Sequence, residues 1–276
     1  MKIKNLALAT AALLGLVGAP ATFACSIAAW NGTVGGTPVA GRPTDATSVP
    51  RYSGQCGLRA AASGSFVADN TPTAEPAFRA RFYVYTGLTS GSAVVYRALN
   101  ASNAEQISVT YNQGSPGTFS FAIPGATAQT VPANTNAWYS IELNWANTGT
   151  LSATVRGAAG TADATASITG GTAGGAIDTA QLGWISGTGV AGARAIVADA
   201  YESRRSTAIG RLCRGDANND GTRNSGDGIS IRNEFLSATL AAGQPDANED
   251  GSVNSGDGII VRNLFLGGQG ACTSGV

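Results

Sequence analysis

The chain has 276 residues with 38 Gly, no His, and 17 basic against 17 acidic residues, so its formal net charge is zero. A nearly neutral chain offers no electrostatic basis for binding nucleic acid, and we expect no nucleic-acid partner. The lack of His excludes Ser-His-Asp and Cys-His catalysis and His-ligated zinc.

Residues 1–24 are predicted to be a secretory signal peptide. Both lysines of the chain lie at its basic start, an apolar run follows from Leu6 to Val17, and small residues surround Ala24. The run is too short for a membrane span, and no other stretch is long and apolar enough to be one. We therefore expect a secreted, extracellular protein, with the periplasm or the cell surface as alternatives. The mature chain would contain no Lys, which also excludes a Schiff base or a P-loop.

Four cysteines in an exported chain predict two disulfides. Three pairings are possible, and proximity in sequence favours Cys25 with Cys56 and Cys213 with Cys272. Cleavage after Ala24 would make Cys25 the first mature residue, so lipoprotein processing is an alternative fate for that residue.

Residues 25–202 are predicted to form a mainly β domain, an antiparallel β-sandwich of the jelly-roll type. Apolar and polar residues alternate between turn signals, and no apolar period of helical length interrupts them. The clearest strand reads WYSIELNWA from Trp138 to Ala146. One face of this strand is predicted to carry Tyr139, Ile141, Leu143 and Trp145, and the other face Ser140, Glu142 and Asn144. Many strands without crossover helices indicate two packed sheets.

The order of features in this region resembles concanavalin A-like and laminin-G-like β-sandwiches. An aromatic strand ends at Trp145, a short hairpin and a Gly-rich loop follow, and the last strand closes near Tyr201. Exposed aromatic rings could stack on sugars, although such rings are also common in protein cores. The candidates are Trp30, Tyr52, Trp138, Trp184 and Tyr201.

Paired carboxylates are the familiar hydrolytic device that remains available to this domain, as in glycoside hydrolases. Asp199 and Glu202 are close in sequence, but three residues along a strand would place them on opposite faces. A pair from separate strands, such as Glu105 with Glu142, stays open. No catalytic residue is assigned, and a glycoside hydrolase with a jelly-roll catalytic domain is an alternative function.

Residues 203–212 are predicted to be a short linker, and residues 213–276 a second, α-helical domain that carries a tandem repeat. The repeats read DANNDGTRNSGDGISIRNEFL from Asp216 and DANEDGSVNSGDGIIVRNLFL from Asp246, 30 residues apart. Each predicts a calcium loop followed by a helix, with oxygen ligands at loop positions 1, 3, 5, 7, 9 and 12 and Gly at the sharp turn of position 6. The alternative for a single copy is an Asx-rich surface turn.

The predicted calcium ligands are side-chain oxygens except at position 7, which contributes its backbone carbonyl. They are Asp216, Asn218, Asp220, Thr222, Asn224 and Asp227 in the first loop, and Asp246, Asn248, Asp250, Ser252, Asn254 and Asp257 in the second. Ca²⁺ takes six to eight oxygens at about 2.3–2.6 Å in flexible geometry, whereas Mg²⁺ demands a stricter octahedron. We therefore expect two bound Ca²⁺ ions.

This tandem arrangement resembles a type I dockerin from about Cys213 to Cys272. The resemblance implies a calcium-dependent docking module that binds a cohesin-like protein, in the setting of extracellular polysaccharide binding and breakdown. A surface domain of the same or a neighbouring protein is another expected partner, and a polysaccharide is a further one. In the family, a hydroxyl pair at loop positions 10 and 11 and a later basic pair recognise the partner. Here Ser225, Arg232, Ser255 and Arg262 match, but Gly226, Asn233, Gly256 and Asn263 do not.

The sequence thus favours a secreted, calcium-binding protein whose tail docks to a protein partner. Its β-sandwich would be a non-catalytic module that binds glycan or another surface component. A structural or adhesive surface protein, in which calcium merely stabilises the tail, is the second alternative.

Overall fold

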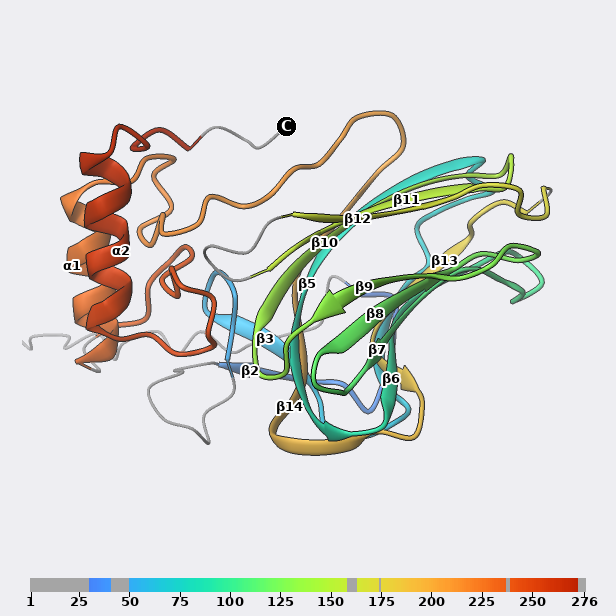
Figure 1. The fold of residues 1–276 in the computed structure, drawn as a ribbon, viewed down its shortest axis with the longest axis horizontal. Helices are drawn as coiled ribbons and strands as arrows, with labels where there is room; N and C mark the ends of the chain where they lie inside the picture. The colour runs from blue at the N-terminus through green and yellow to red at the C-terminus, as the bar shows by residue number, and fades with distance from the viewer. Residues whose placement is uncertain (1–29, 41–49, 158–162, 174, 237–238, 273–276) are drawn as a thin grey trace, which may run out of the picture.

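The computed structural model describes residues 30–40, 50–157, 163–173, 175–236 and 239–272. The described residues form two antiparallel seven-stranded sheets and two helices, α1 (Ser225–Phe235) and α2 (Ser255–Leu266). Figure 1 shows the sheets face to face, with the helices side by side beyond one end of them. The prediction of a mainly β, sandwich-like chain with a short helical tail is confirmed at this level. Neither helix is long and apolar enough to cross a bilayer. The predicted signal peptide and Cys25 lie outside the described residues.

Every neighbouring pair of strands is antiparallel. Sheet A contains, in spatial order, β1 (Gly32–Val34), β4 (Ser65–Asp69), β13 (Thr179–Ser186), β6 (Ser92–Leu99), β7 (Glu105–Asn112), β8 (Gly117–Ala122) and β9 (Gln129–Ala133). Sheet B contains β12 (Ala164–Ile168), β11 (Thr150–Arg156), β10 (Trp138–Ala146), β5 (Ala77–Ser90), β14 (Val190–Arg204), β3 (Cys56–Ala60) and β2 (Thr37–Ala40).

The core between the sheets follows the predicted alternation. On β10, Ile141, Leu143 and Trp145 are buried in the main hydrophobic cluster, as expected for one face of a strand. Phe82 of sheet B stacks on Tyr96 of sheet A, with ring centroids 4.9 Å apart, and so joins the two layers.

A second, smaller cluster lies on the outer face of sheet B, where the tail packs. We call it the aromatic patch: Tyr52, Tyr83, Tyr85, Trp138 and Val197, all buried. The rings of Tyr52 and Tyr83 stack at 3.6 Å between centroids, and Trp138 packs edge-on against Tyr52 and Tyr85. The tail rather than solvent covers this patch, since the hydroxyl of Tyr52 donates to a carboxylate of the tail.

The aromatic rings proposed for sugar stacking are all buried or partly buried. Tyr52, Trp138 and Trp184 are at most 2% exposed. Trp30 and Tyr201 are partly buried against the main core and lie 5.1 Å apart between ring centroids. Tyr52, Trp138 and Trp184 therefore present no ring to solvent, and for these three the core alternative is confirmed.

The tail has a small core of its own between its loops and helices, formed by Ala217, Ile231, Ala241, Ala247, Val253 and Val261. Each helix begins at position 10, within the last turn of its loop, with Asn224 and Asn254 as N-caps in extended conformation. The amide side chain of each cap accepts a hydrogen bond from the helix, which fixes where the helix starts.

Candidate metal centre

The two loops adopt the same backbone conformation. Position 4 has φ of 61° at Asn219 and 62° at Glu249, and position 6 has φ of 83° at Gly221 and 86° at Gly251. Glycine tolerates this left-handed region without steric cost, which explains its presence at position 6 of both copies. The repeat in sequence is therefore also a repeat in structure.

The carboxylate at position 1 organises each loop. It accepts hydrogen bonds from the backbone N–H groups of positions 5 and 6, at 3.0 and 3.0 Å for Asp216 and at 3.2 and 2.7 Å for Asp246. Short acidic side chains in such turns accept from the backbone two or more residues on, which curls the chain around them. Positions 1, 5 and 6 are thereby brought together.

The carboxylate at position 12 closes each loop from the other side. It accepts from the backbone N–H groups of positions 3 and 9, at 3.1 and 2.7 Å for Asp227 and at 3.1 and 2.8 Å for Asp257. Because position 12 is also the third residue of the helix, the bond to position 9 completes a capping box with the Asn N-cap. One side chain thus ties the loop to the helix that leaves it.

The side chains at positions 3, 5 and 7 are neighbours in both loops. The amide of Asn218 donates to Asp220 at 2.8 Å, and Asn248 donates to Asp250 at the same distance. The position-5 carboxylate also accepts from the backbone N–H of position 7, at 2.9 Å in the first loop and 2.8 Å in the second. In the first loop Asn224, at position 9, donates to the hydroxyl of Thr222 at 3.0 Å. The predicted ligands of each loop therefore lie within one hydrogen-bonded ring.

The carboxylates at positions 1 and 12 are buried without a cationic partner. Asp227, Asp246 and Asp257 are fully buried and Asp216 is 5% exposed. Among the described residues, none of these four forms an ion pair with a basic side chain. Charges buried in this way are costly unless something compensates them.

The second loop has the stronger crowding of negative charge. Burial, together with the charges of Asp257 and Asp250, holds the pKa of Asp246 well above its usual value. Burial raises the pKa of Asp257 to about 6, and burial also raises the pKa of Asp227 in the first loop. A hard divalent cation fits this set of oxygens, because it supplies the missing positive charge and prefers carboxylate, amide and carbonyl donors.

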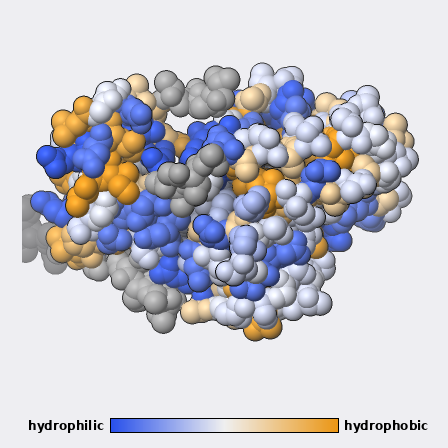
Figure 2. Space-filling view, in the orientation of Figure 1, coloured by the Kyte–Doolittle hydropathy of each residue, from blue (hydrophilic) through white to orange (hydrophobic). Residues whose placement is uncertain are grey.

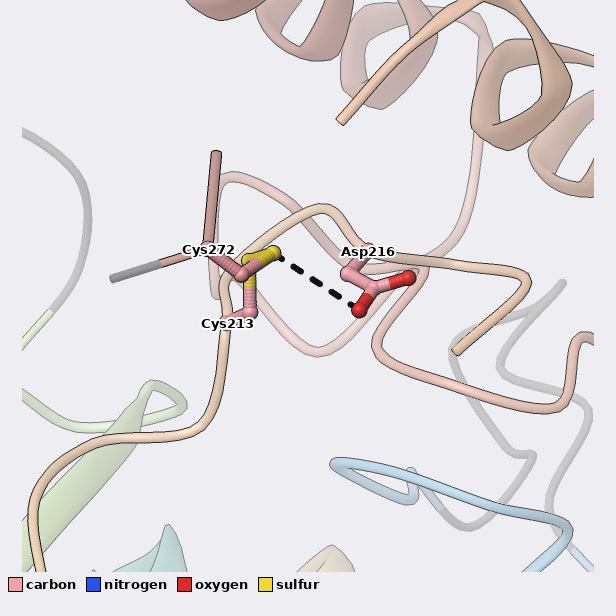
Figure 3. Close-up of side chains that lie close together, drawn as sticks. All are labelled: Cys213, Asp216 and Cys272. Atoms are coloured by element: carbon pink, nitrogen blue, oxygen red, sulfur yellow. Dashed lines mark hydrogen bonds between the residues drawn. A yellow bond between two sulfur atoms is a disulfide. The ribbon is translucent and has the colours of Figure 1, made fainter. Parts of the chain in front are cut away.

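A third group of potential ligands, Cys213, Asp216 and Cys272, does not form a metal site. Figure 3 shows the two sulfurs joined in a disulfide beside the Asp216 carboxylate. The Cys272 sulfur lies 3.7 Å from Asp216 Oδ2, but a disulfide sulfur is not a thiolate and has no proton to donate. The disulfide instead joins the two ends of the tail next to position 1 of the first loop, as the sequence predicted. Cys56 is also disulfide-bonded, while its expected partner Cys25 lies outside the described residues.

Replacing Cys213 and Cys272 by Ser is expected to lower the free energy of unfolding of the tail by about 4 kcal/mol. The bond closes a loop with a sequence separation of 59 residues, and the chain-entropy model assigns a loop of this length about that value. Urea unfolding followed by helix ellipticity in saturating Ca²⁺ checks this expectation. The double variant is used instead of a reductant because a reductant would also attack the bond of Cys56. An unchanged midpoint would contradict the expected stabilisation.

The tail contacts the sandwich through its first helix and its second loop. Arg51, just before the aromatic patch, forms an ion pair with Glu234 of α1 at 2.6 Å, and both side chains are fully buried. Glu249, at position 4 of the second loop, accepts from the Tyr52 hydroxyl at 2.7 Å and pairs with Arg211 of the linker. The two parts of the chain are therefore in direct contact. Sequence reasoning missed these contact residues. One signal was available, because position 4 carries a charged residue in the second loop but Asn219 in the first.

The four residues predicted to recognise a partner are all exposed. In the first repeat the exposed residues are Ser225, Ile229 and Arg232 of α1 and its C-cap Leu236. Their spacing of four, three and four residues places them on one side of a helix. The second repeat exposes Ser255, Ile259, Arg262 and Leu266 in the same way. We call these eight residues the helix face. A groove between the helices includes Ser225, Ser255, Ile259 and Arg262 in its lining, and Figure 2 shows hydrophobic residues gathered over this part of the molecule.

The strand acids proposed as a hydrolytic pair are differently placed. Glu142 lies on β10 of sheet B, whereas Glu105 begins β7 of sheet A. Glu142 accepts from the backbone N–H of Ile209 at 2.8 Å and lies 3.6 Å from Arg156, so it holds the linker against the sheet.

For Asp199 and Glu202 the predicted orientation was wrong. Asp199 lies opposite Tyr83 and Glu202 opposite Arg81, and these partners are two residues apart on β5, so the two acids share a face. The reason is a bulge at Ala200, whose φ is 47°.

Both of these acids have structural partners. Asp199 accepts from the backbone N–H groups of Tyr52 and Ser53 at 2.6 and 3.0 Å, and burial raises its pKa to about 6. Glu202 pairs with Arg81 at 3.2 Å and with Arg204 at 2.7 Å. These carboxylates fix the start of the aromatic patch and the path of the linker.

No protein-family model matches the chain, and no curated protein matches it. Solved structures match it only distantly. A Trypanosoma rangeli sialidase in complex with the inhibitor DANA is 16% identical, with a TM-score of 0.41 over 55% of this chain and 26% of the sialidase. A legume lectin-like domain from Entamoeba histolytica is 8% identical, with a TM-score of 0.39 over 55% of this chain and 84% of that domain.

A CBM2 module of the evolved Dit protein of Lactobacillus casei BL23 phage J-1 is 12% identical, with a TM-score of 0.40 over 61% of this chain and 89% of the module. In two of the first structures found, the matched segment spans only 39% and 26% of the other chain. Likeness of this degree assigns neither a family nor a function.

Proposed function

We propose that this is an exported protein whose tail binds two Ca²⁺ ions and docks to a protein partner through the helix face. The observation that carries the calcium part is the pair of loops whose position-1 and position-12 carboxylates are buried, uncompensated and hydrogen-bonded to the same backbone positions. The sandwich is proposed to be a non-catalytic module that binds glycan or another surface component, as the dockerin resemblance implies.

In each loop the ion would be held by side-chain oxygens of positions 1, 3, 5, 9 and 12 and by the carbonyl of position 7. Bound Ca²⁺ supplies positive charge to three carboxylates that otherwise repel one another. The backbone of each loop orients these carboxylates. The backbone N–H groups at positions 5 and 6 orient the first carboxylate, and those at positions 3 and 9 orient the last. Because position 12 is part of the helix, ion binding and helix formation depend on the same side chain.

The docking part is supported by the composition and symmetry of the helix face. Ile229, Leu236, Ile259 and Leu266 are between 51% and 64% exposed, so the tail presents large apolar side chains to solvent. A contiguous apolar surface with a polar rim is typical of a protein-interaction site. Ser225 and Ser255, with the two arginines, supply the hydrogen-bonding rim at positions that the dockerin resemblance assigns to recognition of a cohesin-like partner.

Replacing Ile229 and Ile259 by Asp is expected to abolish docking without changing calcium binding. Both side chains are exposed, so the substitution buries no charge in the free protein but would bury two in a complex, costing more than a hundredfold in affinity. Binding of the full chain to a panel of type I cohesin domains, measured with and without Ca²⁺, tests this. Val190→Asp is the matched control, since Val190 is 55% exposed on the sandwich. Calcium binding without any cohesin binding would instead favour the structural or adhesive alternative.

A further inference from the structure

The two calcium loops are completed by different parts of the chain. In the first loop, the carbonyl of Gly221 at position 6 accepts from the backbone N–H of Cys272 at 3.2 Å. Its neighbour Thr222 forms an antiparallel bridge with Ala271, so the end of the tail borders this loop. In the second loop, the carbonyl of Gly251 at the same position accepts from the guanidinium of Arg194 at 2.6 Å. A sandwich side chain thus occupies the place that the C-terminal segment takes in the first loop.

Arg194 is held firmly for this role. It belongs to β14, is 8% exposed, donates to the Tyr85 hydroxyl at 3.3 Å and lies with its guanidinium 5.7 Å from the centroid of that ring. Its second terminal nitrogen donates to the hydroxyl of Ser252 at 3.2 Å. Ser252 is position 7, whose backbone carbonyl is a predicted calcium ligand, so Arg194 holds the segment that presents this oxygen.

The residue at position 4 is also buried in the second loop but exposed in the first. Glu249 is 1% exposed, and its carbonyl accepts from the backbone N–H of Trp138 at 3.1 Å. Asn219, its counterpart in the first loop, is exposed. A Cβ added at Gly251 would come within 2.4 Å of the Tyr85 ring, whereas one added at Gly221 would meet nothing within 4 Å. The second loop therefore packs against the sandwich at this face, whereas Asn219 and Gly221 of the first loop border a pocket that Ser53 and Arg81 also line.

We propose that the sandwich completes the second calcium site through Arg194, so that ion binding at this loop and docking of the tail onto the sandwich are coupled. The first site is completed within the tail, by the segment that contains Ala271 and Cys272. By thermodynamic linkage, if docking raises the Ca²⁺ affinity of the second loop by some factor, bound Ca²⁺ raises the docking equilibrium constant by the same factor. Arg194 is a positioning residue, and the inference rests on the proposed calcium function.

Single-site variants of the full chain test the coupling. Asp216→Ala leaves the second loop as the binding site, and Asp246→Ala leaves the first. Adding Arg194→Gln is expected to weaken calorimetric Ca²⁺ affinity at least about fivefold in the Asp216→Ala chain, the lower end of typical coupling, and to leave it unchanged in the Asp246→Ala chain. Equal effects in both chains, or none in the first, would overturn the proposal. If neither single-site chain binds Ca²⁺ with Arg194 intact, the calcium function itself fails.

A pair of glycine variants gives an independent test should Arg194→Gln not fold. Gly221→Ala and Gly251→Ala impose the same backbone strain, since both residues have nearly equal positive φ. Only Gly251→Ala also meets Tyr85 and Arg194. It is therefore expected to undock the tail, seen as a larger radius of gyration by X-ray scattering and faster proteolysis of the linker in saturating Ca²⁺. The same behaviour of both variants would contradict the proposal.

Discussion

Replacing Arg51 by Met is expected to lower the free energy of unfolding of the tail by about 3–5 kcal/mol. The pair with Glu234 is fully buried, and Glu234 also accepts from the backbone N–H of Ala241 at 2.7 Å. Removing Arg51 leaves that carboxylate buried without a cation, and the loss of one partner is the costly way to break such a pair. The described helices both lie in the tail, so ellipticity at 222 nm during urea unfolding follows this transition.

Two further variants separate charge burial from the mere loss of an arginine. Arg204→Met breaks a pair with Glu202 in which both side chains are more than a third exposed, and it should cost less than about 1 kcal/mol. The double variant Arg51→Met with Glu234→Leu should recover much of the loss, because apolar residues of similar volume can replace a buried pair. A single Arg51→Met variant as stable as Arg204→Met would show that the buried pair does not hold the tail in place.

Replacing both Asp216 and Asp246 by Ala is expected to abolish calcium binding and to remove the calcium dependence of tail stability. An ion that binds only the folded state stabilises by about 2.7 kcal/mol per site at a hundredfold excess over its Kd. The variant should also lose structure without calcium, because each Asp accepts two backbone hydrogen bonds that shape its loop. Thermal unfolding with Ca²⁺ and with a chelator measures both effects.

Asp163→Ala is the control for the loss of a single acid, since Asp163 is an exposed sandwich residue paired with Arg156. Its chain should keep the full calcium-dependent shift in melting temperature. A shift that persists in the Asp216/Asp246 double variant would place the ions elsewhere in the molecule.

The features predicted correctly from the sequence are those determined by nearby residues. The turn at position 6 and the presence of a helix at the end of each loop depend on contacts within twelve residues. The apolar face of β10 follows from strand alternation, and the pairing of Cys213 with Cys272 follows from their proximity in sequence. Ser225 and Arg232, which the sequence named, are both exposed and are separated by two helical turns, so local periodicity alone places them on one side of a helix.

What sequence reasoning missed depends on contacts distant in the chain. Arg51 and Glu234 are 183 residues apart, and no local pattern marks them as partners. The bulge at Ala200 changed the face of Glu202 because one extra residue shifts the side-chain alternation. The burial of Tyr52 and Trp138 likewise comes from the tail packing on sheet B, which strand periodicity cannot reveal.

The most direct test of the account is a count of calcium ions in the full chain. The purified protein, freed of metal and then dialysed against Ca²⁺, is predicted to retain two ions per chain, one in each single-site variant, and none in the Asp216/Asp246 double variant. No retained calcium in the unaltered chain, together with no heat of Ca²⁺ binding, would contradict the central claim.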